Sequence, residues 1–543
     1  MVFARRSTTL LAAIIASCAM VLSLTACTSD NKTVVDGQTT VTSNSAGGVA
    51  VFTPSDGITL NQQTPLNKWA KLVPDLTKAL VDAGFKKGDI DHTTSDSLAK
   101  QSRAIQDFVV DHLSNNTTDD SGIAIAPDNM TLLVAPVVEA DASTRQYGDY
   151  ISQNLSTNDA TDEGATSDGE SSEDDSSKDD SSNTESDSTA SDEQAQAVDR
   201  LVSSLKLAKE SGMHVVLLGN SIEGYKPDAF VKFSDAQTIG KLQAEKMVSK
   251  LKLDKASKDN PKYIEVLLPY TAVDEKGNAN DSTFAQEAFR GIWQVLGSYY
   301  QKGVVESPSG TLDGKSTEND WQAVAYDAAK EGSTAKVLDK RLAKTDGQST
   351  LTRIDGIITM NDYIASEVVK ELDDLGYTGS AADINPQITI SGIVGNITGK
   401  KDLSRDAVPD PIKSPENDNA NDSSSSDDDA DEDTSASDKD RDSQWPLVTG
   451  YGAYVSNIPS IVNGKQWMTG MEDRQTIATD IAQACAKLNK DEALNSMPSI
   501  RNSEVGGVKK IPTISEPLLA VSASNLKSAL IDPGYISLAD AGL

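Results

Sequence analysis

The side chains that most often carry catalysis are sparse in this chain and do not have a known catalytic spacing. Its three histidines are His92, His112 and His214, too far apart for a zinc-binding H-E-x-x-H helix. Gly219 begins the run GNSIEG, whose spacing differs from the G-x-S-x-G turn of serine hydrolases. Ser309 begins SGTLDGKS, where the two glycines are one residue too close for a phosphate-binding loop. The sequence therefore predicts a protein that is not an enzyme and that needs no cofactor or metal.

Carboxylates are abundant but concentrated in two tracts. From Asp159 to Glu193 the chain has 14 acidic residues and one lysine, and from Asp402 to Asp442 it has 15 acidic and 4 basic residues. These tracts carry most of the net charge of −33. Neither has the glycine and the final glutamate of an EF-hand loop, so they do not predict a calcium site. Few apolar residues and strong self-repulsion predict disordered insertions, and the net negative charge argues against nucleic acid as a partner.

The N-terminus has the pattern of a secretory signal. Arg5 and Arg6 precede an uncharged apolar run over 10–24, which is short for a membrane span. The run ends in LTAC at Cys27, which resembles the lipobox of bacterial lipoproteins, where the cysteine is diacylated and becomes the new N-terminus. The resemblance implies a lipid anchor on the extracellular face of the cell membrane; ordinary secretion with a chance cysteine is the alternative. Residues 28–45 are rich in serine and threonine and predict a flexible tether.

The chain has three cysteines and no predicted internal disulfide. Cys18 would leave with the signal and Cys27 would be acylated, so Cys485 alone remains. It lies in TIATDIAQACAKL, whose spacing predicts a helix with Cys485 on its buried face.

The remaining body alternates apolar runs with amphipathic ones, and at about 400 residues it is too large for one core. The predicted strands are GGVAVFTP, MTLLVAP, MHVVLLG, KYIEVLLPY, GVVES and IDGIITM. Helical spacing follows in NKWAKLVPDLTKALVDAGF, AQAVDRLVSSLKLAKESG, STFAQEAFRGIWQVLGSYYQKG, NDWQAVAYDAAKEG and DYIASEVVKELDDLG. This alternation predicts parallel sheets covered on both faces, in two α/β lobes that divide near 233–240. Ligands of such sheets bind at the carboxyl ends of the strands, here in a cleft between the lobes.

Four segments of the body carry a family resemblance: FSDAQTIGKLQAE from Phe233, NDWQAVAYDAA from Asn319, IDGIITMNDYIASEVVKELDDLGY from Ile354, and PLVTGYGAYVSNIPSIVNGKQWMT from Pro446. In this order, after a lipobox, they resemble the sugar-type (type 1) periplasmic solute-binding proteins of ABC importers, in the ribose, xylose and multiple-sugar group. The resemblance covers 48–543 apart from the acidic tracts. It implies an α/β fold of two hinge-linked, Rossmann-like lobes with parallel sheets.

The resemblance also implies the boundaries of the parts. After the signal at 1–27 and the tether at 28–45, the first lobe comprises 46–235 and 474–505, and the second comprises 236–473 and 506–543. Disordered acidic insertions interrupt the lobes at about 156–194 and at about 402–443. The chain would cross between the lobes near Ser234–Asp235, near Glu472–Asp473 and between Val505 and Lys510.

A sugar site needs aromatic faces for the ring and planar polar groups for the hydroxyls. Trp69 and Trp321 match aromatic positions of the family, and packing in the core is an equal alternative for each. Asn361 follows the strand IDGIITM at its carboxyl end and matches a family asparagine that contacts sugar. Its neighbour Asp362 is the predicted cap of the next helix.

Four further polar residues complete the matches. Gln101 and Asp235 match polar positions near the cleft or the hinge, and Asp473 matches a polar position on the hinge side. Asp281 lies in a loop that would face the cleft, or it caps the helix that follows.

Two departures from the family weaken the match to a monosaccharide site. The family's Asp-Arg pair, which grips ring hydroxyls, is replaced by Gly219 and Asn220. After PLVTG, where the family has an aspartate, this chain has Tyr451. Asn220 could still donate hydrogen bonds and Tyr451 could stack on a ring, so both are candidate ligand contacts. Without the charged Asp-Arg pair, we expect either a ligand that is larger or less polar than a monosaccharide or a weaker affinity.

The sequence thus predicts a lipid-anchored protein that captures a carbohydrate and presents it to the permease subunits of an ABC importer. We expect a monomer that meets the membrane through its lipid anchor only. Two alternatives stay open: a surface sensor or interaction protein with the same fold and no role in transport, and a binder of a small solute other than a sugar.

Overall fold

The computed structural model describes residues 46–55, 65–115, 125–138, 145–156, 185–273, 280–343, 350–382 and 444–543. Ser45–Leu543 forms one compact unit. The predicted signal, the acylated Cys27 and the tether lie outside the described residues. So do residues 157–184 of the first acidic insertion and the whole of the second. The predicted extent of the first insertion is wrong at its end, because a helix already begins at Glu185.

The first lobe is built on a seven-stranded sheet with the order β15-β16-β7-β5-β3-β1-β2. Its strands are β1 (Gly48–Pro54), β2 (Ile90–Ser95), β3 (Met130–Val134), β5 (His214–Leu218), β7 (Ala229–Lys232), β15 (Ile500–Val505) and β16 (Val508–Ser515). All neighbours are parallel except the hairpin of β15 and β16. The order β2-β1-β3-β5-β7 is that of a doubly wound sheet, in which the chain starts in the middle and winds outward in both directions.

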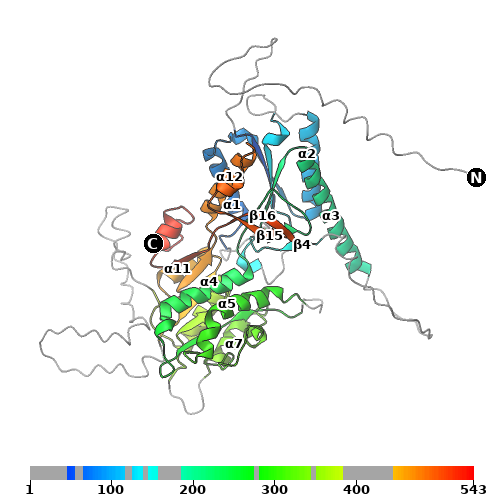
Figure 1. The fold of residues 1–543 in the computed structure, drawn as a ribbon. Coiled ribbons are helices and arrows are strands. Elements are labelled where there is room, and N and C mark those ends of the chain that lie inside the picture. The colour runs from blue at the N-terminus through cyan, green and yellow to red at the C-terminus, as the bar shows by residue number, and fades with distance from the viewer. Residues whose placement is uncertain are drawn as a thin grey trace, which may run out of the picture. The chain divides into compact units, whose positions relative to one another are not determined.

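Helices cover both faces of the first sheet because alternate strand residues are apolar on both sides. Val49 and Val51 of β1 pack with α1 (Trp69–Asp82) and α12 (Arg474–Leu488). Ala50 and Phe52 pack with α2 (Leu98–Asn115) and α3 (Glu185–Glu210). Figure 1 shows the two pairs on opposite sides of the sheet. Continuous apolar strands of this kind are typical of buried parallel sheets, as the sequence indicated.

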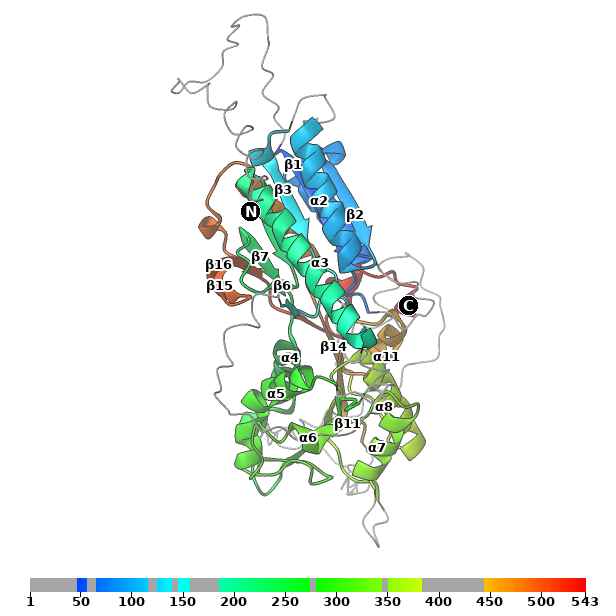
Figure 2. The same cartoon turned by 90° about the vertical axis from the view of Figure 1, so that its right-hand side faces the viewer.

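The second lobe has a six-stranded sheet with the order β10-β8-β12-β13-β14-β17, parallel except for the last strand. Its strands are β8 (Lys262–Val266), β10 (Val305–Glu306), β12 (Gly356–Ile358), β13 (Leu447–Tyr451), β14 (Met468–Met471) and β17 (Leu519–Ser522). The helices are α4 (Ala236–Leu251), α5 (Thr283–Gln301), α6 (Trp321–Val324), α7 (Ser333–Arg341), α8 (Asp362–Leu375) and α11 (Ile458–Val462). Figure 2 shows α4 and α5 on one side of this sheet and α7 and α8 on the other. The predicted fold class, two α/β lobes with parallel sheets, is confirmed.

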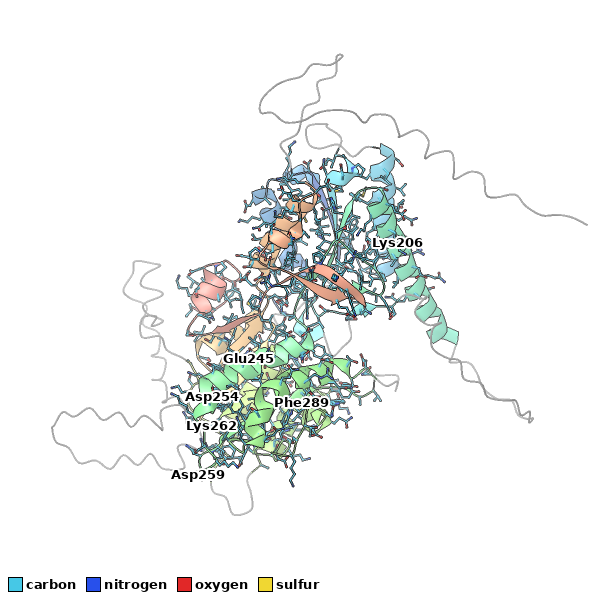
Figure 3. All side chains as sticks on the ribbon, in the orientation of Figure 1. Lys206, Glu245, Asp254, Asp259, Lys262 and Phe289 are labelled. Carbon is cyan, nitrogen blue, oxygen red and sulfur yellow. The ribbon has the colours of Figure 1, made fainter. Side chains whose placement is uncertain are left out.

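Side chains fill the space between the sheets and their helices (Figure 3). In the second lobe Phe289 of α5 is fully buried and stacks on Trp293, with 5.8 Å between the ring centroids. Cys485 is buried in α12, as its helical spacing predicted. Burial raises the pKa of its thiol, so it is a core side chain and not a nucleophile.

The chain passes between the sheets three times. It leaves the first sheet after β7 and enters α4 at Ala236, and it returns after β14 to enter α12 at Arg474. The predicted third crossing between Val505 and Lys510 is wrong. Gly506 and Gly507, with φ of 55° and 77°, form the turn between β15 and β16, a left-handed backbone that suits glycine. The third passage is 516–518, between β16 and β17, so 506–515 belong to the first lobe.

One predicted helix is also wrong. The run NDWQAVAYDAAKEG predicts a continuous helix from Asn319, but α6 is a single turn. The chain then enters the two-residue strand β11 (Ala325–Tyr326), which pairs with β9 (Leu268–Pro269). Tyr326 is buried and its hydroxyl lies 3.0 Å from Thr334 Oγ1. Tertiary packing of this side chain overrides the local helical preference.

Candidate functional site

The carboxyl ends of the strands of the two sheets face each other within the Ser45–Leu543 unit. The amide of Leu66, which follows β1 in the first lobe, donates to the carbonyl of Gly452, which follows β13 in the second (2.9 Å). Asn67 Nδ2 donates to the hydroxyl of Tyr451 at 3.0 Å. Loops at the ends of β1 and β13 therefore meet at the edge where parallel sheets bind ligands.

A buried polar cluster joins the first two passages. Ser234 precedes α4, and its amide donates to Glu472 Oε1 at 2.6 Å. Its hydroxyl also contacts Glu472 and lies 2.5 Å from the hydroxyl of Tyr451. Burial raises the pKa of Glu472 to about 7, and hydrogen bonds from Ser234 and Tyr451 oppose that rise. The cluster fixes the two passages to each other, at the place where a hinge between the lobes would lie.

Asn361 reaches across from the end of β12. Its Oδ1 caps α8 by accepting from the amide of Ile364 at 2.9 Å, and its Nδ2 donates to Gln146 Oε1 at 3.0 Å. The preceding Met360 has a left-handed φ of 69°, a conformation that costs about 1–3 kcal/mol for a residue that is not glycine. Strain of this kind is concentrated at functional sites, and here it orients the Asn361 amide toward the first lobe.

Asp362 does not cap α8, so that prediction is wrong. Its carboxylate accepts from Gln466 Nε2 at 2.7 Å, from Thr469 Oγ1 at 2.9 Å and from the amide of Tyr454 at 2.9 Å. Burial raises its pKa to about 6, and these hydrogen bonds oppose the rise. Asp362 therefore holds the loop after β13 in place beside Asn361.

A segment of the first lobe lies against the second lobe at this edge. The short helix η4 (Arg145–Tyr147) follows β3 in the chain, yet Tyr147 packs in the core of the second lobe. The Tyr147 ring is 1% exposed, with its centroid 4.7 Å from that of Phe284 and 6.3 Å from that of Tyr451. Burial raises the pKa of its phenol, while the nearby amide of Asn361 lowers it. The Tyr147 hydroxyl makes no hydrogen bond of normal geometry within the described residues.

The same segment is held on the side of the first lobe. Asp149 Oδ1 lies 2.7 Å from Lys68 Nζ, and Asp149 Oδ2 accepts from the amide of Trp69 at 3.1 Å. Tyr150 stacks on Phe233 with 4.7 Å between ring centroids. The two residues that follow Gly148 are thus tied to the first lobe or to its passage, whereas Tyr147 before it packs in the second lobe.

The two predicted tryptophans have different surroundings. Trp69 is 2% exposed and packs edge-on against Tyr150 (5.0 Å) and Phe233 (5.7 Å), which supports the core alternative. Trp321 packs edge-on against Tyr270 at 5.1 Å, beyond the end of β8. Trp321 therefore lies on the second lobe at the carboxyl ends of its strands, the edge where parallel sheets bind ligands, although it too is largely buried.

The other predicted side chains hold local structure. Gln101 bridges the carbonyl of Ala135 (2.8 Å) and the amide of Val137 (2.9 Å) after β3. Asn220 accepts from the amide of Gln153 (2.9 Å) and donates to the carbonyl of Pro136 (2.9 Å). Two of the aspartates cap helices, Asp235 for α4 and Asp473 for α12. The predicted capping role of Asp281 is wrong, because Ser282 holds the N-cap position of α5 and Asp281 accepts from the amide of Thr283 beside it. Among the nine predicted contacts, the side chains of Asn361 and Tyr451 bond across the lobes at this edge.

The sequence did not identify Gln146, Tyr147 or Glu472 as residues of the site, although Glu472 lies at a predicted crossing. The first two lie in the run RQYGDY, a polar stretch with two tyrosines that has neither helical nor strand periodicity. Glu472 directly follows the apolar strand MTGM, and a carboxylate at that position indicates a strand end.

Two cavities lie away from this edge. One of about 610 Å³ is lined by residues of α1, α12 and Pro533–Gly534, and one of about 510 Å³ lies along α1. In the described part of the chain, no group of three or more histidine, cysteine, aspartate or glutamate side chains is placed to hold a metal ion. None of the helices in the same ranges is both long enough and apolar enough to cross a membrane.

No protein-family model and no curated protein matches the chain. Among solved structures, it is similar to an ABC transporter solute-binding protein from Clostridium phytofermentans with bound β-D-glucose (17% identity, 91% of this chain and 99% of the other, TM-score 0.44). It is also similar to a carbohydrate transporter solute-binding protein from Chloroflexus aurantiacus in complex with D-glucose (18%, 92% and 98%, 0.42). A third is a periplasmic ribose ABC transporter protein from Conexibacter woesei (14%, 90% and 96%, 0.41). Likeness at this level assigns no ligand to the chain.

Proposed function

We propose that this protein captures a small carbohydrate between its two lobes and presents it to the membrane subunits of an importer. The observation that carries the proposal is the meeting of the carboxyl ends of two parallel sheets across a hydrogen-bonded hinge cluster. In a fold of this kind the ligand site is that edge, and rotation about the passages opens and closes it. The sequence resemblance to sugar-binding proteins supplies the class of ligand.

The side chains at this edge have the chemistry that sugar recognition requires. Phe284 and Trp321 are aromatic surfaces of the second lobe that suit the apolar face of a sugar ring. The amide of Asn361 combines a donor and an acceptor, as ring hydroxyls require. We assign these residues to binding and no residue to catalysis, and the proposal needs no cofactor or metal.

The proposal includes a location. Acylation of Cys27 would anchor the protein on the extracellular face of the cell membrane, with the lobes free to meet permease subunits as a monomer. Two acyl chains are sufficient for stable anchoring, whereas one chain is marginal. When the full chain is expressed in a bacterial host, it should partition into the detergent phase and its Cys27→Ala variant should not. If the full chain and the Cys27→Ala variant partition equally, the lipid-anchor part of the proposal is wrong and the rest of the proposal is unaffected.

The ligand class can be tested by thermal unfolding of the full chain with pentoses, hexoses, oligosaccharides, amino acids and nucleosides. A ligand at about a thousand times its dissociation constant adds about 4 kcal/mol to the free energy of unfolding. In domains of this size each kcal/mol raises the midpoint by about 2–4 °C. A rise with one sugar class supports the proposal, and a rise with amino acids or nucleosides alone moves it to another solute.

A second candidate is a surface sensor or interaction protein that uses the fold without transport. It is favoured by one observation: Asn361 and Tyr451 are already bonded to other side chains of the protein, Gln146 and Asn67. The loss of the family's Asp-Arg grip agrees with it. If no solute in the panel raises the unfolding midpoint, this second candidate becomes the preferred function.

A further inference from the structure

Residues 146–151, called the strap here, belong to one lobe by chain order and to the other by packing. They lie between β3 and the short strand β4 (Asn154–Leu155), which pairs with β6 (Ser221–Ile222). Tyr147 and Ile151 nevertheless pack in the hydrophobic core of the second lobe. The strap therefore connects the lobes at the edge assigned above to the ligand.

The part of the strap that reaches the second lobe resembles a ligand in its chemistry. Tyr147 presents a flat ring to Phe284, with 55° between the planes, and to Tyr451. Its polar end lies near the Asn361 amide, which lowers the pKa of the phenol. A ring held by aromatic faces, with a hydroxyl next to a planar amide, is also how a sugar ring would be held.

The strap is seated by polar contacts on both lobes. Gln146 accepts from Asn361 Nδ2 through its side chain (3.0 Å) and from the hydroxyl of Tyr454 through its carbonyl (2.6 Å). The amide of Asp149 donates to the carbonyl of Asn67 at 2.8 Å. These contacts hold the strap against both lobes.

Gly148 lets the strap approach the first lobe closely. It has φ of 100°, and a Cβ there would lie 2.6 Å from the Asn67 carbonyl oxygen. A larger residue would therefore push the backbone away from Asn67 and strain it as well. Glycine at position 148 therefore permits the close approach of the strap to Asn67.

One polar group of the strap, the Tyr147 hydroxyl, is poorly bonded where the strap packs against the second lobe. The Tyr147 hydroxyl is buried and makes no hydrogen bond of normal geometry in the described residues, which leaves a desolvated polar group. A solute whose hydroxyl bonds to the Asn361 amide with normal geometry would avoid this cost. This favours exchange of Tyr147 for a solute.

We propose that the strap occupies the solute site of this protein, with the Tyr147 ring in the place of a solute ring, and that a solute binds only after Tyr147 has left. The inference rests on the proposed function. It implies that the apparent dissociation constant equals the intrinsic one divided by the fraction of molecules whose strap is out. Weakening the strap must therefore tighten binding.

The test compares the full chain with its Tyr147→Ala variant by calorimetric titration with D-glucose, D-ribose and D-xylose as probes. We expect the variant to bind at least one of them at least tenfold more tightly than the parent. Asp149→Asn, which removes the negative charge that pairs with Lys68 and keeps the Tyr147 side chain, should tighten binding at least threefold and serves if Tyr147→Ala does not fold. The matched control is Tyr225→Ala, because Tyr225 is also buried, with a hydroxyl that makes no hydrogen bond within the described residues, but packs in the core of the first lobe.

The outcomes separate the two claims. Tighter binding by Tyr147→Ala and parental affinity in Tyr225→Ala support the strap. Equal or weaker binding by Tyr147→Ala overturns the strap and leaves the proposed function intact. Failure of the parent and of the folded Tyr147→Ala variant to bind any of the three sugars overturns both the proposed function and the strap as its occupant.

Discussion

Glu472 and Ser234 lie 238 positions apart in the chain and join the two passages through a hydrogen bond of 2.6 Å from the Ser234 amide to Glu472 Oε1. Glu472 is 1% exposed, and no arginine or lysine is among the groups that shift its pKa. A buried carboxyl without a cationic partner favours its protonated form. The hinge of this protein therefore contains a group that titrates near neutral pH.

This relationship predicts how stability depends on pH. Burial raises the pKa of Glu472 from 4.5 to about 7, so the folded protein binds the proton more tightly than the unfolded chain does. Its contribution is fully present below pH 4.5 and is lost as the pH rises through about 7, a change of about 3 kcal/mol. Asp362 acts in the same direction, with a loss that is complete near pH 6. Urea unfolding at pH 5 and pH 8 should show a smaller loss for Glu472→Gln than for the parent, and equal losses would contradict this account.

Capping of α8 gives a prediction for Asn361. Asn361→Ala removes the acceptor for the Ile364 amide and should lower the free energy of unfolding by about 1 kcal/mol. Asn361→Ser keeps an acceptor for the Ile364 amide but loses the amide that donates to Gln146, so it should be closer to the parent in stability than Asn361→Ala while it changes solute affinity. Urea denaturation and calorimetry of the two variants check this. Two equally destabilised variants would show that the cap is not the main role.

Removal of the Tyr147 hydroxyl should not lower the free energy of unfolding, unlike most substitutions of core residues. Because this hydroxyl is buried without a good hydrogen bond, Tyr147→Phe removes a desolvated polar group and keeps the ring against Phe284. The free energy of unfolding should stay the same or rise by about 1 kcal/mol. A clear loss in the urea midpoint would mean that the hydroxyl has a partner in solution.

Trp69 tests the assignment of a predicted ligand contact to the core. Trp69→Ala should lower the free energy of unfolding by about 3–5 kcal/mol, because the side chain is 2% exposed and packs on Tyr150 and Phe233. Chemical denaturation measures this, and a companion titration with sugar shows whether affinity changes. A small loss of stability together with a lost affinity would return Trp69 to the ligand site.

The architecture was predictable because parallel strands buried on both faces are continuous apolar runs, such as HVVLL of β5 and MTLLV of β3. Glycine at 376 marks the end of α8 with a left-handed φ of 92°. Where a local sequence pattern predicted the wrong element, a contact between residues far apart in the chain determined the structure. Tyr326 leaves the predicted helix to pair with β9.

The site was harder to predict because its residues are paired by tertiary structure. Asn361 and Asp362 are adjacent, and either side chain can cap a helix. Which of them caps α8 depends on the exact residue at which the helix begins, and in the structure that residue is Asp362. The contact between Gln146 and Asn361 spans 215 positions and has no local signature. RQYGDY has neither helical nor strand periodicity, so nothing in the sequence indicates that Tyr147 enters the core of the other lobe.

Residue-resolved hydrogen exchange of the full chain, with and without the sugar that raises its unfolding midpoint most, tests the central claim most directly. The account predicts slower exchange at the amide of Ile364, which donates to Asn361, and faster exchange at the amide of Asp149, which donates to Asn67 from the strap. Slower exchange confined to the cavity between α1 and α12, with Ile364 and Asp149 unchanged, would contradict a solute site between the lobes.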